Sequence, residues 1–315
     1  MQVFPKMAVF WLVLLHSNFL SAQNRAAYLT TGSNSTAIEN SNTKTTALAI
    51  PFEKAGNLLL VKAELDGTEG VFILDTGAPT LVVNQQNNQQ EIKAKGITGQ
   101  LSANDTFIKN FRWNNAEWKN LSGLSVDMHH FNDVSKNGVQ GLIGYEILKD
   151  YEVIVDPSAQ TITLLSNRKE LPYDPNIFLA SLSMKQQNHM PVIELLINGK
   201  KILLGIDTGA EINFLDQGLF EKGQIRDFEE LGSSIVKGLG GNSEKRERKV
   251  RVKNTQAGSI NLADQTFTIS DLSKLFPNNG EDLQVQGIVG NAFLNQFRYS
   301  INYRKGIFLI LDKIK

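Results

Sequence analysis

The tripeptide Asp-Thr-Gly occurs twice in this chain, as Asp75-Thr76-Gly77 and as Asp207-Thr208-Gly209. Each copy ends an apolar run and is followed by alanine. A carboxylate at the end of a buried strand is costly unless it is hydrogen-bonded or used in chemistry. Two carboxylates held close together cannot both ionise, so one keeps a proton and the pair offers an acid and a base at one place. The two aspartates are therefore the first candidates for catalysis.

The sequence around the two tripeptides is repeated as well, in the same order. If the two aspartates are aligned, three pairs of segments match at shifts of 132, 142 and 146 residues: 65–67 with 197–199, 95–99 with 237–241, and 139–144 with 285–290. Only two insertions, of ten and four residues, are needed to keep the order. Self-similarity over a long period indicates a duplicated structural unit.

The order of motifs in each half resembles the retropepsin-type aspartic proteases. That order is Asp-Thr-Gly-Ala, then a glycine-rich segment about twenty residues later, then Gly-apolar-apolar-Gly. Both copies lie in one polypeptide, as in the two lobes of pepsin-like enzymes, and the chain is similar to bacterial retropepsin-like aspartyl proteases over roughly residues 47 to 312. The resemblance implies an all-β, bilobal acid-protease fold, made of two duplicated retropepsin-like β-barrel lobes with few short helices.

The resemblance also implies an activity, that of an aspartic endopeptidase acting on a peptide or protein substrate. Asp75 and Asp207 would face each other across the lobe interface and activate a water between them, with no metal and no other cofactor. The hydroxyls of Thr76 and Thr208 would bond across to the opposite loop. Because Gly77 and Gly209 lack a side chain, their backbone N–H groups can approach the carboxylates.

Two further pairs of residues have expected roles near the aspartates. Pepsin-like enzymes usually carry Ser or Thr where this chain has Ala78 and Ala210, so a hydrogen bond to the charged carboxylate is missing here. Losing that bond raises the pKa values of the pair and predicts a weakly acidic to near-neutral optimum. Gly144 and Gly290 are expected to let a strand pass close behind each catalytic loop, a structural role that a tight turn in a buried strand would serve equally.

The glycine-rich segments are candidate flaps that would close over an extended substrate. The candidate residues are Gly96 and Gly99 in the first half, and Gly238, Gly240 and Gly241 in the second. Neither segment contains the tyrosine of a pepsin flap, and one flap per lobe would resemble a retroviral dimer. Plain hairpin turns are the alternative.

Composition excludes several classes of protein. The formal charge is zero, so no bulk electrostatic attraction to nucleic acid is expected. The chain has no cysteine, which excludes disulfides, thiol catalysis, cysteine-ligated metals and a lipoprotein anchor.

The N-terminus has the pattern of a secretory signal peptide, predicted over residues 1–23. Lys6 precedes a short apolar run that ends before a polar break, and Ser21-Ala22-Gln23 offers small residues for cleavage. The run is too short to span a bilayer as a helix, and a buried first strand is the alternative. We therefore expect a secreted or periplasmic protein with no stable membrane insertion after cleavage.

The rest of the chain is expected to form a flexible polar linker and two lobes that work together as a pseudo-symmetric monomer. The predicted linker is 24–46, and the lobes are 47–172 and 173–315. Strand patterns dominate both lobes. Residues 145–148 and 291–294 are each expected to form one helical turn, and 216–231 a longer helix with one apolar stripe.

Weaker features have plain explanations. Residues 244–253 carry six basic residues and two acidic ones, and are expected to form a solvated hairpin arm, with a site for an anionic partner as the alternative. His129, His130 and His189 lack the spacing of a metal site and are expected in surface loops.

Two functions compete with peptide hydrolysis. One is a degenerate module that keeps the peptide groove without turnover, and the other is an interaction protein of the cell envelope. Both Asp-Thr-Gly motifs are intact, and an unused buried acid pair is destabilising, which favours the enzyme.

Overall fold

The computed structural model is an all-β fold in two lobes, with three short helices in the part of the chain that it describes. For residues 91–96 and 99–101 only the backbone is described. The described residues are 49–84, 91–96, 99–128, 131, 135, 138–166, 173–174, 178–238, 244–277 and 283–314.

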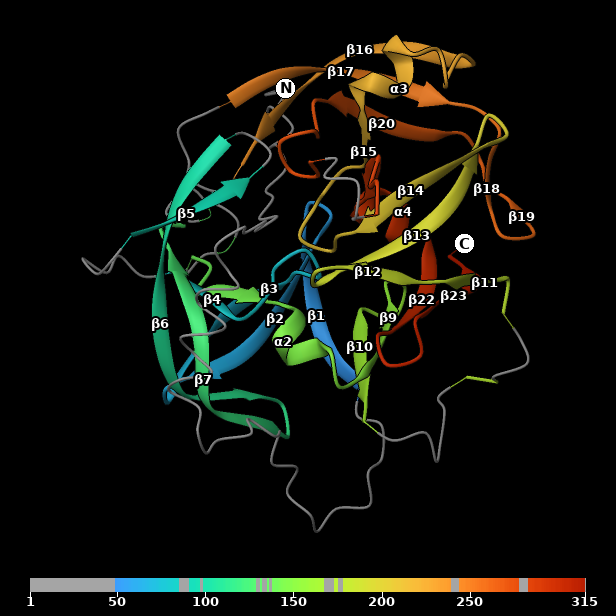
Figure 1. The fold of residues 1–315 in the computed structure, drawn as a ribbon. Coiled ribbons are helices and arrows are strands. Elements are labelled where there is room, and N and C mark those ends of the chain that lie inside the picture. Colours follow the sequence, from blue (N-terminus) through green and yellow to red (C-terminus); the bar gives the residue numbers. More distant parts are fainter. Residues whose placement is uncertain are drawn as a thin grey trace, which may run out of the picture.

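One sheet of thirteen strands contains the first half of the chain and three strands of the second half (Figure 1). Its order is β11-β23-β22-β9-β10-β1-β2-β3-β8-β4-β7-β6-β5. The strands of the first half are β1 (Ala49–Ala55), β2 (Leu58–Leu65), β3 (Thr68–Leu74), β4 (Val82–Asn84), β5 (Glu91–Gly96), β6 (Gly99–Trp113), β7 (Ala116–Val126), β8 (Gly141–Ile143), β9 (Glu152–Asp156) and β10 (Thr161–Leu165). The strands of the second half in this sheet are β11 (Ala180–Ser183), β22 (Phe297–Asn302) and β23 (Ile307–Lys313).

A second sheet of ten strands is built from the second half alone. Its order is β16-β17-β20-β15-β21-β14-β13-β18-β19, and β12 pairs with β13 beside this path. The strands are β12 (Lys185–Gln187), β13 (Met190–Ile197), β14 (Lys200–Ile206), β15 (Phe214–Asp216), β16 (Phe228–Lys237), β17 (Glu244–Val252), β18 (Thr255–Ala257), β19 (Ile260–Asn261), β20 (Gln265–Ser270) and β21 (Gly287–Val289).

The pairing of strands repeats between the two halves. In the first half β3 runs parallel to β8, and β4 runs antiparallel to β8 and parallel to β7. In the second half β14, β21, β15 and β20 make the same three pairings. The strands that precede the two aspartates therefore lie in equivalent surroundings, as the sequence repeat predicts.

The two halves meet in the pairing of β9 with β22, where Val155 lies opposite Tyr299 (Figure 1). The inner positions of these strands are buried, and the main hydrophobic core includes apolar side chains of both halves. Burying a shared core at this junction favours one fixed arrangement of the lobes.

Two of the three helices are as predicted. The helices α2 (Tyr145–Leu148) and α4 (Asn291–Leu294) each form a single turn directly after Gly144 and Gly290.

The helix predicted for residues 216–231 is wrong. Helix α3 (Gln217–Glu221) is short, Gly223 follows with a φ of 62°, and the chain then enters β16. The predicted apolar stripe still packs, because Phe220 and Phe228 lie edge to face with ring centroids 5.1 Å apart. A turn that reverses the chain brings these two rings together, and periodicity alone cannot distinguish that from a continuous helix.

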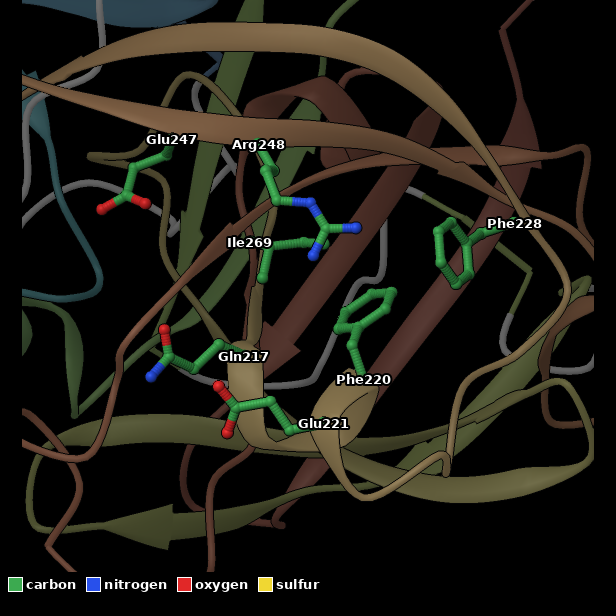
Figure 2. A pocket seen from close by; sticks show the side chains of 7 residues that line it. All are labelled: Gln217, Phe220, Glu221, Phe228, Glu247, Arg248 and Ile269. Atoms are coloured by element: carbon green, nitrogen blue, oxygen red, sulfur yellow. The ribbon is translucent and has the colours of Figure 1, made fainter.

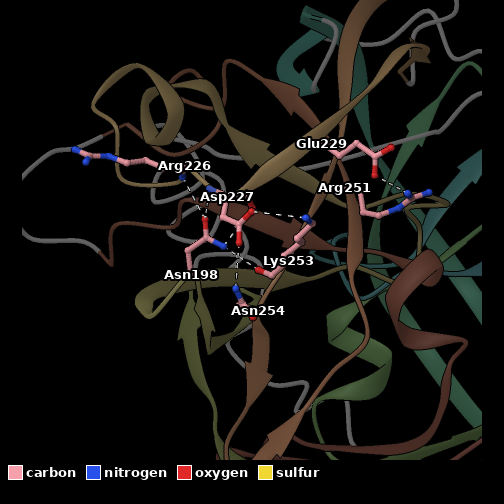
Figure 3. A network of polar contacts seen from close by, with 7 residues as sticks. All are labelled: Asn198, Arg226, Asp227, Glu229, Arg251, Lys253 and Asn254. Carbon is pink, nitrogen blue, oxygen red and sulfur yellow. Dashed lines mark hydrogen bonds and ion pairs between the residues drawn. The ribbon is translucent and has the colours of Figure 1, made fainter.

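Polar contacts attach the segment after α3 to neighbouring turns (Figure 3). The Asn198 side-chain oxygen accepts from the backbone N–H groups of Arg226 and Asp227, at 3.2 and 3.0 Å. Its amide nitrogen donates to the backbone carbonyls of Asp227 and Lys253, at 3.3 and 2.8 Å. One side chain at the β13–β14 turn thus holds two other segments together.

The basic segment 244–253 forms strand β17 in a hairpin with the partly acidic β16. Three ion pairs join the two strands of this hairpin. They are Arg248 with Glu230, Arg251 with Glu229 at 2.7 Å, and Lys237 with Glu244. The predicted hairpin is confirmed, but it is not a free arm, because β17 also pairs with β20 and Val250 and Val252 are buried. The three cations are paired within the hairpin.

Candidate active site

Each Asp-Thr-Gly loop begins where a central strand ends. The backbone N–H of Asp75 donates to Ile143 at 3.0 Å, and that of Asp207 donates to Val289 at 3.0 Å. Asp75 and Asp207 therefore follow β3 and β14 at equivalent positions, each next to the end of a parallel neighbour, β8 or β21. Each half of the chain therefore places an aspartate carboxyl group at the end of an equivalent strand.

The two aspartates face each other in the interior. Asp75 is 2% exposed and Asp207 is 0% exposed. A Cβ atom placed on Gly77 would lie 2.3 Å from Asp207 Oδ2, and one placed on Gly209 would lie 2.4 Å from Asp75 Cγ. Each glycine therefore lies directly against the carboxyl group of the opposite loop, and any side chain there would occupy its space.

Backbone N–H groups support both carboxyl groups. Asp75 Oδ1 accepts from Gly77 at 2.9 Å and from Ala78 at 3.0 Å. Asp207 Oδ1 accepts from Gly209 at 2.7 Å, and the N–H of Ala210 donates to the Asp207 backbone carbonyl at 3.3 Å. The two carboxyl groups lie close enough that the charge of Asp75 affects the titration of Asp207, although Asp207 Oδ2 has no hydrogen-bond partner among the described residues.

Burial dominates the titration of the pair. It raises the pKa of Asp75 to about 6, against the smaller lowering effect of its hydrogen bonds. Burial and then the charge of Asp75 raise the pKa of Asp207 well above its usual range. The direction agrees with the expectation drawn from Ala78 and Ala210, but the largest cause is desolvation and not a missing hydroxyl.

The two threonines join the loops, as the family resemblance implies. The Thr76 N–H donates to Thr208 Oγ1 at 3.0 Å, and the Thr208 N–H donates to Thr76 Oγ1 at 3.1 Å. Each hydroxyl then donates to a backbone carbonyl of the other lobe at 2.8 Å, Thr76 to Ile206 and Thr208 to Leu74. All four bonds cross between the lobes and are buried.

Gly144 and Gly290 lie directly behind the loops. A Cβ atom on Gly144 would lie 2.3 Å from the Thr80 carbonyl, and one on Gly290 would lie 2.4 Å from the Ile212 carbonyl. These glycines allow the closest approach of β8–α2 and β21–α4 to the aspartate loops, so a structural role accounts for both.

The candidate flaps are only partly visible. Gly96 and Gly99 pair with each other at the end of the β5–β6 hairpin, so this segment is a hairpin. Gly238 is buried just after β16, while Gly240 and Gly241 lie outside the described residues. Closure over a substrate stays a prediction for both segments.

The expectation of a surface loop is wrong for His189. This residue is 7% exposed, and its Nε2 lies 2.7 Å from the Gly77 carbonyl oxygen, in the first Asp-Thr-Gly loop. Burial lowers its pKa to about 4. The signal that could have found it is positional: the 132-residue shift aligns His189 with Asn57, which also contacts the opposite lobe. His129 and His130 lie outside the described residues.

A separate cavity of about 320 Å³ lies beside α3 and the β16–β17 hairpin (Figure 2). Figure 2 shows Arg248 extending toward the rings of Phe220 and Phe228. Arg248 is paired with Glu230, and Glu247 accepts from Ser270 at 3.2 Å. The cavity contains no residue of either Asp-Thr-Gly loop, and these two charged groups already have partners within the protein.

Among the described residues, no group of three or more His, Cys, Asp or Glu side chains is placed to hold a metal ion. Within the same residues, no helix has the length and apolar character needed to cross a membrane.

Comparison with known proteins agrees with the site. Residues 193–293 match the family model described as aspartyl protease. The matched segment contains the second Asp-Thr-Gly and the Gly287–Gly290 segment, and supports assignment to the aspartyl protease family. No curated protein matches the chain.

Proposed function

We propose that this protein is an aspartic endopeptidase that hydrolyses peptide bonds with a water molecule activated between Asp75 and Asp207. One observation carries the proposal: two aspartates at the ends of equivalent strands are buried, and the carboxyl group of each lies against the Asp-Thr-Gly glycine of the opposite lobe. A buried acid pair with no cation to neutralise it is destabilising, and catalysis gives it a function.

In the proposed mechanism the pair carries one proton in total. In this mechanism Asp75, whose Oδ1 accepts from the Gly77 and Ala78 N–H groups, holds the negative charge and accepts a proton from the attacking water. Asp207 donates its proton to the substrate carbonyl oxygen as the water oxygen bonds to the carbonyl carbon. When the resulting tetrahedral intermediate collapses, the C–N bond breaks and the amine nitrogen takes the proton that Asp75 received. One hydroxyl of the intermediate returns its proton to Asp207 as the C=O bond of the product forms.

The proposal extends to the oligomeric state, the substrate and the location of the protein. One chain supplies both aspartates, which supports a pseudo-symmetric monomer with a peptide or protein substrate. The signal-like N-terminus supports a secreted or periplasmic location, with the mature protein beginning near residue 24.

The test is cleavage of a mixed peptide library by the protein from residue 24 onward, at pH 3 to 8. Asp75→Asn and Asp207→Asn are each expected to abolish turnover, and a statine-type inhibitor to block the wild type. Asp66→Asn is the matched control, because Asp66 lies at an exposed turn and the equivalent residue of the other lobe is Asn198.

A folded wild-type protein that cleaves nothing over this range would contradict the proposal. Peptide binding without cleavage would then support the degenerate peptide-binding module instead.

A further inference from the structure

The peptide unit between Gly77 and Ala78 connects two different lobes to one aspartate. At one end, the Ala78 N–H donates to Asp75 Oδ1 at 3.0 Å, and it also lies 3.2 Å from the backbone carbonyl of Asp75. At the other end, the Gly77 carbonyl accepts from His189 Nε2 at 2.7 Å. A planar peptide moves as one body, so the histidine bond fixes the direction of the N–H that supports the carboxylate.

His189 comes from the second lobe. It occupies the tip of the β12–β13 hairpin, in a two-residue turn whose first residue, Asn188, has a φ of 56°. The carbonyl oxygen can only accept, so Nε2 must carry the hydrogen and the neutral ring has its lone pair on Nδ1. Burial keeps this ring neutral at the pH of the proposed reaction.

The other lobe lacks this arrangement. The equivalent hairpin tip, between β1 and β2, carries Asn57, whose side chain donates to the Glu211 carbonyl at 3.0 Å. Among the described residues, no donor contacts the Gly209 carbonyl, which is the counterpart of Gly77. The bond from His189 to the Gly77 carbonyl therefore acts on one aspartate loop only, so the two nearly symmetric aspartates have different surroundings.

We propose that His189 is a positioning residue that makes Asp75, and not Asp207, the charged member of the pair. The inference rests on the proposed function. His189 orients the 77–78 peptide, and by bonding its carbonyl it strengthens the N–H at the opposite end as a donor to Asp75 Oδ1. A stronger donor to the ionised carboxylate favours its charged form.

Glutamine and asparagine at position 189 differ by one methylene. Comparing them distinguishes the loss of the hydrogen bond to Gly77 from the loss of the histidine itself. His189→Gln places an amide nitrogen near the position of Nε2 and keeps a donor. His189→Asn is shorter and stops short of Gly77, yet the fold already accommodates asparagine at the equivalent tip, as Asn57. Asn57→Ala is the matched control, because it removes the corresponding side chain in the other hairpin.

In His189→Asn we expect kcat to fall about tenfold or more, with KM within about twofold, because the carboxylate is mispositioned and substrate contacts are unchanged. The midpoint of the acid limb of kcat/KM should rise by about half to one pH unit. His189→Gln should restore most of both, and Asn57→Ala should leave the acid limb in place. An unchanged acid limb in His189→Asn, or no difference between Asn and Gln, would overturn the inference.

A measurement that needs no turnover separates this inference from the proposed function. In the full chain labelled with ¹⁵N-alanine, the Ala78 amide proton should move upfield in His189→Asn and return in His189→Gln. The carboxyl carbon of Asp75 should titrate at higher pH in the Asn variant. If the variants show these changes but the wild-type protein cleaves no peptide, the inference about His189 is supported and the proposed peptidase activity is rejected. If the Ala78 amide does not move and the Asp75 titration does not shift in folded variants, the inference about His189 is rejected.

Discussion

Thr76 and Thr208 lie on different lobes, and the backbone N–H of each donates to the hydroxyl of the other. Because each hydroxyl also donates to a carbonyl of the opposite strand, the two loops share a closed set of four buried bonds. Such a set has no free member, so replacing one threonine leaves a buried donor and a buried acceptor without partners. The arrangement fixes the distance between the two aspartates that follow the strands.

Thr208→Val should therefore destabilise the protein by about 2–4 kcal/mol, since valine keeps the shape and loses the hydroxyl. The Thr76 N–H and the Leu74 carbonyl lose their partners. Urea unfolding measures the change. Thr208→Ser retains the hydroxyl and should cost much less, and equal losses in the two variants would contradict this account.

Gly209→Ala should reduce turnover by about 100-fold or more, because the new methyl group would displace the Asp75 carboxyl group by a large fraction of its van der Waals radius. Peptide cleavage under saturating substrate measures the effect. Gly67→Ala is the control: it lies at the β2–β3 turn with a φ of 84° and open space around it. It should cost about 1–2 kcal/mol of stability with unchanged turnover. Activity retained in Gly209→Ala would contradict the close approach of Gly209 to the Asp75 carboxyl group.

The pH–rate profile should peak between weakly acidic and near-neutral pH. Under the proposed mechanism, activity requires one aspartate of the pair to be ionised and the other protonated. The profile of kcat/KM therefore rises with pH through the pKa of Asp75, near 6, and falls through the higher pKa of Asp207. Initial rates from pH 3 to 9 with one peptide test this. A peak near pH 3 would rule out the raised pKa values.

His189 should make folding stability depend on pH between 7 and 4. Its folded pKa is lowered from 6.5 to about 4, so the unfolded chain binds the proton first as the pH falls through this window. Stability from this group is complete above pH 6.5 and decreases toward pH 4, by up to about 3 kcal/mol.

The raised pKa of Asp75 acts in the opposite direction, because the folded state binds that proton first between about pH 6 and 4. The measurement is therefore the difference in unfolding free energy between wild type and His189→Asn at several pH values. This difference should shrink as the pH falls. Parallel curves would mean that the pKa of His189 is the same in the folded and unfolded states, and would contradict the lowered value.

The polar contacts around the segment that follows α3 should differ in their contribution to stability. Asn198→Ala removes four hydrogen bonds that join three segments, and should cost about 2 kcal/mol or more. Arg251→Ala breaks an exposed pair with Glu229 and should cost less than about 1 kcal/mol. Thermal unfolding of the two variants compares them directly, and a larger loss in Arg251→Ala would contradict this ranking.

The sequence by itself determined the duplication, the two candidate aspartates and the predominance of strands. Those features depend on residues close together in the chain: an apolar run that ends at Asp75 or Asp207, and a glycine that precedes a single helical turn at Tyr145 or Asn291. The repeat added long-range information, because two similar segments adopt similar folds. Local pattern and self-similarity were sufficient there.

Only the tertiary structure decided where His189 lies, which aspartate is better supported, and that residues 216–231 turn back after Glu221. A hairpin tip looks the same in sequence whether it faces solvent or the opposite lobe, and 112 residues separate His189 from the carbonyl it contacts. Likewise, two identical tripeptides become unequal only when different neighbours pack against them. Desolvation and donor geometry, which set the pKa values of the pair, are properties of that packing.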